Sequence, residues 1–179
     1  MYGRGYLYAK NNDNWFFGFW KTTLSQLLSK KFNLPLYHLD LFFWKPNWVP
    51  TPDQEWKEFI KKLVKEDKWI LDGNFTSTLD LRIQHADTII FIDLPRALRL
   101  YRVVMRRLMK NRERPDINKH CKEQLDWKLL KSVWLFGKKR KPEIMKKLEQ
   151  SKNNKRIYII ESNSDLKDFM QKITQTQFN

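Results

Sequence analysis

The sequence predicts a single α/β domain in three layers, with a parallel sheet covered by helices on both faces. Short apolar runs of strand length alternate with segments of helical periodicity along the whole chain. The 179 residues suffice for one packed domain, and a hydrophobic content of 41% with 15% aromatic residues excludes a disordered chain. No apolar run approaches the roughly 18 residues of a membrane span, so we expect a soluble protein with no membrane partner.

The cysteine content indicates a reducing compartment. Cys121 is the single cysteine and cannot form an internal disulfide, which fits a cytoplasmic protein. Residues 1–14 lack the apolar core of a secretory signal. The three histidines and the cysteine form no metal-ligand pattern: His38, His85, His120 and Cys121.

The first half of the chain predicts two helices and a strand. Residues 22–31 place Leu24, Leu27 and Leu28 on one helical face. The run LYHLD predicts a strand that ends at Asp40, and the proline-broken, aromatic residues 41–52 predict an ordered loop. Thr51 to Gln54 has the form of a capping box. The helix that follows carries apolar residues at helical spacing: Trp56, Phe59, Ile60, Leu63 and Val64.

Three further strands and several helices are predicted after this helix. The run KWILDGNF predicts a buried strand ending in Asp72-Gly73-Asn74, followed by a short helix around Leu79 and Arg82. TIIFIDLPR is the clearest strand, and Pro95 opens a long helix. Further helices to residue 156 are broken at Pro115 and Pro142. RIYIIES predicts the last strand, and residues 165–173 the last helix.

The formal net charge of +15 is concentrated in one third of the chain. Residues 96–156 hold 21 Lys and Arg against 6 Asp and Glu, while the remainder holds 14 of each sign. Such a region attracts polyanions such as nucleotide phosphates or a nucleic-acid backbone. A solvated helical surface explains the same lysines about equally well.

Lys21-Thr22 matches half of a phosphate-binding loop. The signature G-x-x-x-x-G-K-[ST] follows an apolar strand, and its backbone N–H groups, lysine and hydroxyl hold phosphates and magnesium. Here Trp15 and Trp20 occupy the two glycine positions, and residues 10–14 are polar instead of apolar. The signature is therefore incomplete in the sequence as written.

A shift of the reading frame by one base restores the signature. Tryptophan has the single codon TGG, so the shifted codons at Trp15 and Trp20 can only encode glycine, while residues 11–14 can become Ile-Met-Ile-Ile. One permitted reading of residues 8–23 is MQKIMIIGSSGSGKTT. We hypothesise that one base was lost near the Lys21 codon and that residues 1–20 are out-of-frame translation; the alternative is coincidence. An intact frame on resequencing the gene would refute the hypothesis.

With this repair, residues 21–150 resemble the bacterial DNA topology modulation protein family, P-loop kinases related to adenylate kinase. The resemblance rests on LPLYHLD, FWKPNWVPTP, WILDGNF, TLDLR, ADTIIFIDLPR, YRVVMRRL, RPD and LDWKLLKSVW. It implies a P-loop kinase-like fold for residues 1–179 as a single domain, with a five-stranded parallel sheet in the order 2-3-1-4-5. It also implies a basic helical lid over about residues 106–128, and ATP and Mg²⁺ as cofactors.

The resemblance further implies roles for individual residues. Lys21 would bridge the terminal phosphates, and Gly18, Thr22 and Thr23 would belong to the same cofactor site. Thr22 would also bind magnesium directly, and Asp72 would bind it through water. The phosphate acceptor would be bound by three residues, Asp40, Asn74 and Arg82, with Asp40 accepting its hydroxyl proton. Arg106 and Arg107 would stabilise the charge of the moving phosphoryl group.

Structural roles compete with each of these assignments. Lys21 could simply begin a helix, Asp40 could cap a turn, Asp72 could cap a strand end, and Arg82 could form a surface salt bridge. Trp44 and Trp48 could stack on a base, although core packing is the more common role of such side chains.

Two functions remain after the sequence is considered. An ATP-dependent kinase of a small molecule, with a nucleoside or nucleotide among the candidate acceptors, explains Asp40, Asp72, Arg82 and the recoverable loop together. A basic nucleic-acid-binding protein that affects DNA topology without catalysis explains only the charge. For the sequence as written we expect weak or absent ATP binding, because Trp20 stands where backbone must approach phosphate.

Overall fold

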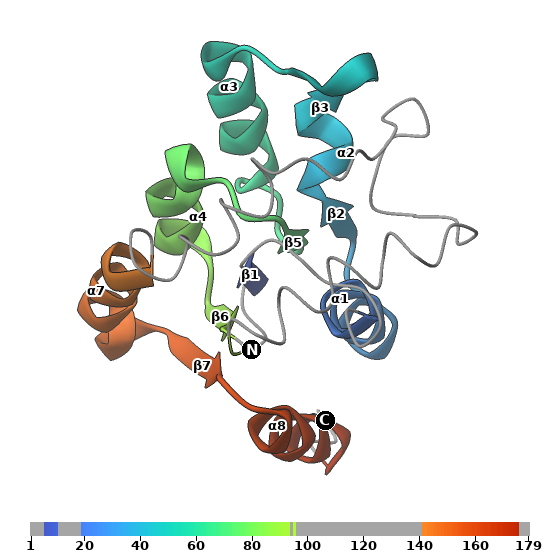
Figure 1. Ribbon diagram of the computed structural model, residues 1–179, viewed down its shortest axis with the longest axis vertical. Coiled ribbons are helices and arrows are strands. Elements are labelled where there is room, and N and C mark those ends of the chain that lie inside the picture. Colours follow the sequence, from blue (N-terminus) through green and yellow to red (C-terminus); the bar gives the residue numbers. More distant parts are fainter. Residues whose placement is uncertain (1–5, 11–18, 94, 96–140, 176–179) are drawn as a thin grey trace.

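The computed structural model describes residues 6–10, 19–93, 95 and 141–175. Its centre is a parallel sheet in the order β2-β5-β1-β6-β7, in which β2 and β7 are the two edge strands (Figure 1). The strands are β1 (Tyr6–Lys10), β2 (Leu36–His38), β5 (Ile70–Asp72), β6 (Thr88–Ile92) and β7 (Arg156–Ile160). Numbered along the chain, these five strands follow 2-3-1-4-5. The prediction of a mixed α/β class with parallel strands is confirmed.

The central strand lies earlier in the sequence than the phosphate-loop signature predicts. A strand that leads into that signature would end at residue 14, directly before Trp15. Instead, β1 ends at Lys10, and its Cα atoms pair with β5 from Tyr6 opposite Ile70 to Tyr8 opposite Asp72. Residues 11–18 lie outside the described part of the chain, and α1 begins at Phe19.

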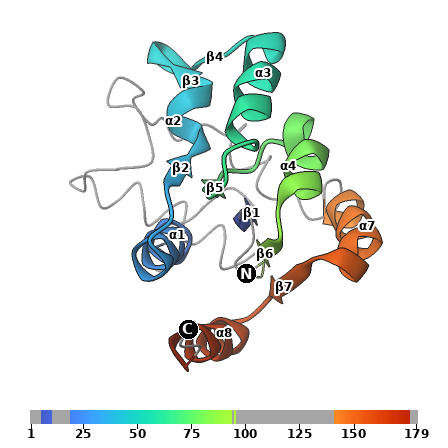
Figure 2. The same cartoon turned by 180° about the vertical axis from the view of Figure 1, so that it is seen from behind.

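Helices cover both faces of the sheet, as Figures 1 and 2 show from opposite sides. On one face lie α1 (Phe19–Phe32) and α8 (Asn163–Gln175), which enclose a core that includes Leu28, Ile90 and Leu166. On the other face lie α3 (Asp53–Leu63), α4 (Leu79–His85) and α7 (Lys141–Ser151). The strand β6 is buried along its whole length because both cores contact it.

The helical faces agree with the sequence pattern, with one exception. Trp56, Ile60, Leu63 and Val64 are buried, and Phe59 is partly buried against the same core, as predicted for α3. In α1, Leu24 and Leu28 are buried, but Leu27 of the same helical face is 42% exposed. The two buried leucines are four residues apart, which is the spacing of one helical stripe.

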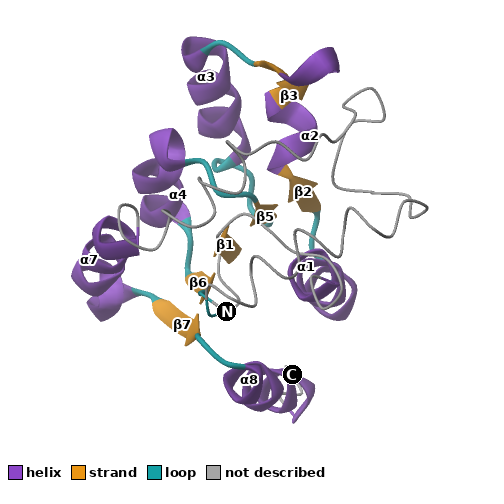
Figure 3. Ribbon diagram, in the orientation of Figure 1, coloured by secondary structure: helices purple, strands orange, loops and turns teal. Residues whose placement is uncertain are grey.

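The aromatic segment after β2 is regular structure and not a loop. It forms a short helix α2 (Leu39–Phe43) and a two-stranded antiparallel hairpin of β3 (Trp44–Lys45) and β4 (Val49–Pro50), seen above the sheet in Figure 3. A 3-10 turn over Pro46–Trp48 joins the two strands. Local hydrogen bonds therefore organise a segment whose prolines suggested irregular chain.

The predicted capping box at Thr51 does not form. The Thr51 hydroxyl instead donates to the carbonyls of Phe42 and Phe43, at 3.1 and 2.8 Å, and so ties α2 to the start of α3. A reciprocal capping pair occurs at α8, where Ser162 Oγ accepts the Asp165 N–H at 3.1 Å. Asp165 Oδ2 in turn accepts the Ser162 N–H at 2.8 Å.

The last elements follow the prediction. β7 and α8 lie where RIYIIES and residues 165–173 predict them, although α8 extends by two residues at each end. Pro142 stands in the first turn of α7, where proline is tolerated. A 3-10 turn over Lys152–Asn154 connects α7 to β7. No helix among the described residues has the length and apolarity needed to cross a membrane.

Candidate functional site

A buried polar cluster lies where two neighbouring strands end. Asp72 is the last residue of β5, its side chain is inaccessible to solvent, and its Oδ2 lies 2.9 Å from His38 Nδ1 at the end of β2. Ser25 Oγ of α1 makes a long contact of 3.5 Å to the same carboxylate oxygen. The carboxyl ends of adjacent parallel strands meet at one edge of a sheet, which is where ligands bind in open α/β sheets.

The first turn of α1 brings the half-signature to this cluster. Lys21, Thr22 and Thr23 all lie in α1, which begins at Phe19 and so starts three residues before the helix predicted over residues 22–31. Ser25 follows Lys21 by four residues and Thr22 by three, so these positions share one side of the helix. Because Ser25 contacts Asp72, that side of α1 is turned towards the end of β5.

The expectation that the sequence as written binds ATP weakly or not at all rests on Trp20 and stays a prediction. Trp20 is the second residue of α1, at the point where the signature requires a glycine so that backbone can approach phosphate. By donor type, Asp72 and Thr22 fit the predicted magnesium site, since a carboxylate and a hydroxyl are hard oxygen ligands. Asp72 supplies the carboxylate, and Thr22 stands one helical turn from Ser25.

Asp40 does not end a strand. The strand β2 stops at His38, and Asp40 lies in the first turn of α2, where a carboxylate is favoured by the helix dipole. Its backbone carbonyl accepts the N–H of Trp44. Asp40 remains two residues after His38 and therefore near the same edge of the sheet, but on a helix.

Arg82 is fully buried, so the alternative of a surface salt bridge was wrong. Its guanidinium donates from Nη1 to the Gly73 carbonyl at 2.9 Å and from Nη2 to the Phe75 carbonyl at 2.5 Å. A third, longer bond runs from Nε to the Thr78 carbonyl at 3.4 Å. Burial lowers the pKa of Arg82 to about 9, which still leaves the side chain protonated at neutral pH. Arg82 thus holds the chain that follows Asp72.

That chain passes close to α2. The backbone of Gly73 lies so near Leu39 that a Cβ at position 73 would stand 2.6 Å from the Leu39 Cβ. Asn74, predicted to bind the acceptor, comes next and is partly exposed. The Phe75 ring then packs against Phe43 and Trp56, with centroid distances of 4.4 and 4.8 Å.

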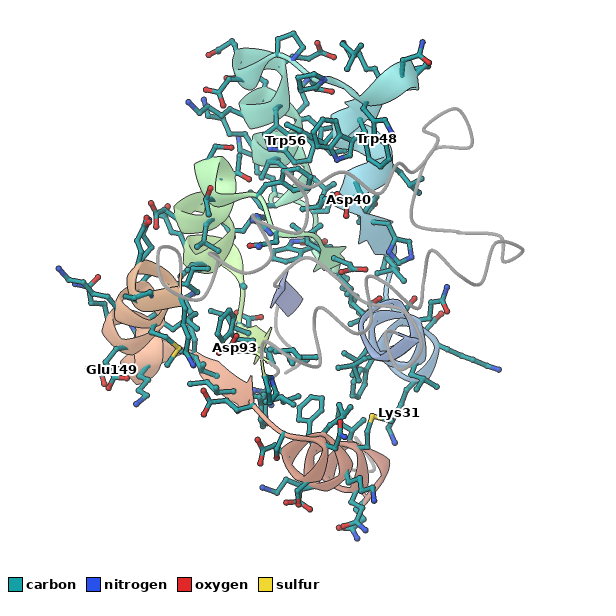
Figure 4. All side chains as sticks on the ribbon, in the orientation of Figure 1. Lys31, Asp40, Trp48, Trp56, Asp93 and Glu149 are labelled. Carbon is teal, nitrogen blue, oxygen red and sulfur yellow. The ribbon has the colours of Figure 1, made fainter. Side chains whose placement is uncertain are left out.

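Trp44 and Trp48 form an edge-to-face pair with ring centroids 5.5 Å apart. Trp44 also meets Phe43 edge to face at 4.8 Å, and Phe43 continues to Trp56 at 5.1 Å. Figure 4 labels Trp48 and Trp56 at two ends of this aromatic group. Both Trp44 and Trp48 are half-buried, which agrees with the packing role, while base stacking is not tested.

Several predicted site residues lie outside the described residues. These are Gly18, Arg106 and Arg107, together with the predicted lid over 106–128 and most of the basic region. Among the residues that the structure does describe, no group of three or more histidine, cysteine, aspartate or glutamate side chains could hold a metal ion.

Two polar groups at this edge were not predicted from the sequence. His38 was given no role, although it is the partner of Asp72. The sequence feature that could have indicated it is a histidine at the end of the strand next to the one that ends in Asp72. Lys141 was also given no role, yet its Nζ lies 2.6 Å from Asp93 Oδ2 and 2.8 Å from Glu161 Oε1, where β6 and β7 end. Figure 4 labels Asp93 beside β6.

Comparison with known proteins gives distant likenesses only. No protein-family model matches the chain, and no curated protein matches it. A solved structure from Chloroflexus aurantiacus, described as a "putative kinase", shares 16% identity over 98% of this chain and 99% of its own, with a TM-score of 0.46. An uncharacterized protein from Eubacterium ventriosum shares 14% identity over 95% and 97%, with a TM-score of 0.41. Because both TM-scores lie below 0.5, neither likeness bears on what the chain does.

Proposed function

We propose that this chain is an ATP-binding phosphotransferase of the DNA topology modulation type, a kinase of a small molecule, impaired in the sequence as written. The observation that carries the proposal is the contact between α1 and the end of β5. Asp72 is buried there against Ser25, one helical turn after Lys21 and Thr22. A lysine, a hydroxyl and a buried carboxylate at one sheet edge are the groups that phosphoryl transfer requires.

The proposed role of each residue follows from its position in the fold. Lys21 and Thr22, in the first turn of α1, are the proposed ligands of phosphate and magnesium. His38 holds Asp72 by a hydrogen bond of 2.9 Å, as outer partners of metal-site carboxylates commonly do. Asp40, in the first turn of α2, is the proposed acceptor of the proton from the substrate hydroxyl. ATP, when bound, supplies the phosphoryl group.

The impairment follows from the two tryptophans. Trp15 and Trp20 replace glycines whose missing side chains let backbone N–H groups wrap a phosphate. The hypothesis of a lost base near the Lys21 codon accounts for both substitutions at once. It also accounts for a strand β1 that ends four residues earlier than the signature requires.

The proposal is tested by comparing the chain as written with the repaired chain, which carries MQKIMIIGSSGSGKTT over residues 8–23. We expect ATP with Mg²⁺ to raise the melting temperature of the repaired chain and to leave the chain as written nearly unchanged. Lys21→Ala in the repaired chain is the matched control and should abolish the shift. Equal ATP affinity in both chains would refute the damaged loop, and no shift in either would refute the kinase.

The described residues give no observation that favours nucleic-acid binding, the alternative function. Four lysines of the described basic stretch are engaged within the fold. Lys141, Lys147 and Lys152 pair with carboxylates, and Lys155 donates to the carbonyls of Gln84 and Ala86. DNA affinity that falls steeply with salt, without any effect of nucleotide, would reverse this preference.

A further inference from the structure

The strand β7 is one edge of the sheet, and its backbone is bonded to the sheet through alternate residues. The Arg156 N–H donates to the Asp87 carbonyl at 2.9 Å, where the strand begins. The Ile160 carbonyl accepts the Asp93 N–H at 2.8 Å, where the strand ends. Because successive residues of a strand direct their N–H and C=O groups to opposite sides, Tyr158 also faces β6.

Ile157 and Ile159 direct their N–H and C=O groups away from the sheet. Within the described residues, neither forms a backbone hydrogen bond on that side. Figures 1 and 2 show no described helix or strand beyond β7 there. The open stretch ends at Glu161, whose N–H is donated to Asp165 Oδ2 at 2.9 Å. The N–H and C=O groups of both isoleucines are thus placed to pair with a further strand.

The open stretch lacks the features that usually protect an edge strand. Natural edge strands carry charged side chains, proline or a bulge where a second strand could pair. The stretch Ile157–Ile159 is apolar or aromatic and half-buried, and β7 pairs with β6 without a break in register. The charged residues lie at its two ends, with Lys155 and Arg156 before it and Glu161 after it.

The stretch is complementary to itself. In an antiparallel pair centred on Tyr158, Ile157 lies opposite Ile159 of a second copy, and the two residues exchange both hydrogen bonds. Every outward backbone group of the stretch then has a partner. The same register sets Lys155 opposite Glu161 of the second copy, and opposite charges stabilise a cross-strand pair. Centring the pair on Ile159 would instead oppose Ile157 to Glu161, whose N–H is already bonded.

We propose that two copies of this chain associate through β7, by antiparallel pairing of Ile157–Ile159 about a twofold axis that joins their sheets. The inference goes beyond the proposed function, because it requires neither ATP nor an intact phosphate loop. The candidate site at the ends of β2 and β5 is separated from this edge by β1 and β6.

Sedimentation equilibrium of the chain as written, from about 10 µM to 1 mM, measures the association. Ile159→Pro removes one outward N–H from each copy and keeps every bond to β6, since proline is tolerated at the free side of an edge strand. Ile159→Val is the matched control, because it keeps the N–H. We expect the dissociation constant of the dimer to rise about tenfold or more in Ile159→Pro, and less than about threefold in Ile159→Val.

Charge reversal at Glu161 tests the register without altering the backbone. Glu161→Lys places a lysine opposite Lys155 of the second copy and should raise the dissociation constant about tenfold. Glu58→Lys makes the same change in net charge at an exposed position of α3, which lies away from β7 in both views (Figures 1 and 2). It should leave the dissociation constant within about twofold.

Amide hydrogen exchange followed by NMR needs no variant, so it tests the proposal even if Ile159→Pro fails to fold. With rising protein concentration, the amides of Ile157 and Ile159 should exchange more slowly, whereas that of Tyr158, bonded to β6, should change less.

Three results would overturn the inference: a chain that stays monomeric over the whole concentration range, equal dimerisation of Ile159→Pro and Ile159→Val, or a dimer in which exchange at Ile157 and Ile159 is unaffected. Because ATP is absent throughout, failure of the kinase proposal would leave these outcomes unchanged.

Discussion

Gly73 and Leu39 are in backbone-to-side-chain contact where β5 passes α2, and the contact leaves no room for a methyl group. A Cβ built on Gly73 would stand 2.6 Å from the Leu39 Cβ and 3.1 Å from a ring carbon of Phe75. The Leu39 Cβ is fixed to its own helix, so it cannot yield as the end of a flexible side chain would. The glycine thus sets how closely α2 approaches the loop that follows Asp72.

We therefore expect Gly73→Ala to destabilise the protein by about 1–3 kcal/mol through overpacking. Urea unfolding, followed by fluorescence, measures the change in the free energy of unfolding. Ser77→Ala, at an exposed position of the same loop, serves as the control and should change it by less than about 0.5 kcal/mol. Equal stability of Gly73→Ala and the unmodified chain would contradict the close contact.

Arg82→Lys should destabilise the fold despite keeping the charge. A lysine cannot reproduce the fork that reaches the carbonyls of Gly73 and Phe75 together, so at least one buried carbonyl loses its donor. We expect a loss of about 1–3 kcal/mol in the free energy of unfolding. Arg156→Lys, an exposed site on β7, is the control. Full rescue by lysine would show that charge alone matters at position 82.

Asp72→Asn should separate folding from ligand binding. Asparagine keeps the shape of the side chain but removes the charge that the proposed magnesium site requires. In the repaired chain we expect the magnesium-dependent part of ATP affinity to fall about tenfold or more, measured by calorimetry with and without Mg²⁺. Asp80→Asn, which alters an exposed pair with Lys147, should leave it unchanged. Retained magnesium dependence in Asp72→Asn would remove Asp72 from the site.

Lys141 should stabilise the fold in a pH-dependent way. Hydrogen bonds to Asp93 and Glu161 raise the pKa of Lys141 above its ordinary 10.5. The resulting stabilisation is complete below the ordinary pKa and is lost as the pH rises through the raised value. The difference in melting temperature between the unmodified chain and Lys141→Met should therefore be constant from neutral pH to about 10, and shrink above 10.5. A difference that grows above pH 10.5 would contradict the ion pairs.

The hairpin turn stores backbone strain at Trp48. Its φ is 60° and that of Asn47 is 62°, a conformation that costs a bulky residue about 1–2 kcal/mol. Both Trp48→Ala and Trp48→Gly lose the contact with Trp44, but only glycine relieves the strain. We expect Trp48→Gly to be more stable than Trp48→Ala by about 1 kcal/mol in urea unfolding. The opposite order would exclude a left-handed residue at this position.

Elements with a clear pattern of apolar residues were predictable from the sequence. α3 and β6 are examples, since the spacing of Trp56, Ile60 and Leu63 and the unbroken run TIIFI admit few alternatives. The aromatic segment was misjudged because prolines at 46 and 50 suggested a loop, whereas Pro46 starts a turn and Pro50 ends a two-residue edge strand.

For the candidate site, the sequence predicted where Asp72 and α1 lie in the fold, but not which side chains contact them. Asp72 and the first turn of α1 could be placed at one sheet edge because strands in parallel sheets end together. The partnership of His38 with Asp72 depends on which strands are neighbours, and that order follows from tertiary packing. Likewise, the sequence alone does not distinguish Arg82 from any other arginine on a short helix, because its partners are carbonyls of a loop that only the fold brings to it.

The ion pair between Lys141 and Asp93 brings together two points of the chain that are far apart in sequence. Asp93 follows β6 and Lys141 begins α7, so the end of this strand and the start of this helix lie next to each other. Lys141 also pairs with Glu161, the residue directly after β7. One cation thus links the ends of two neighbouring strands to the first turn of a helix that covers one face of the sheet.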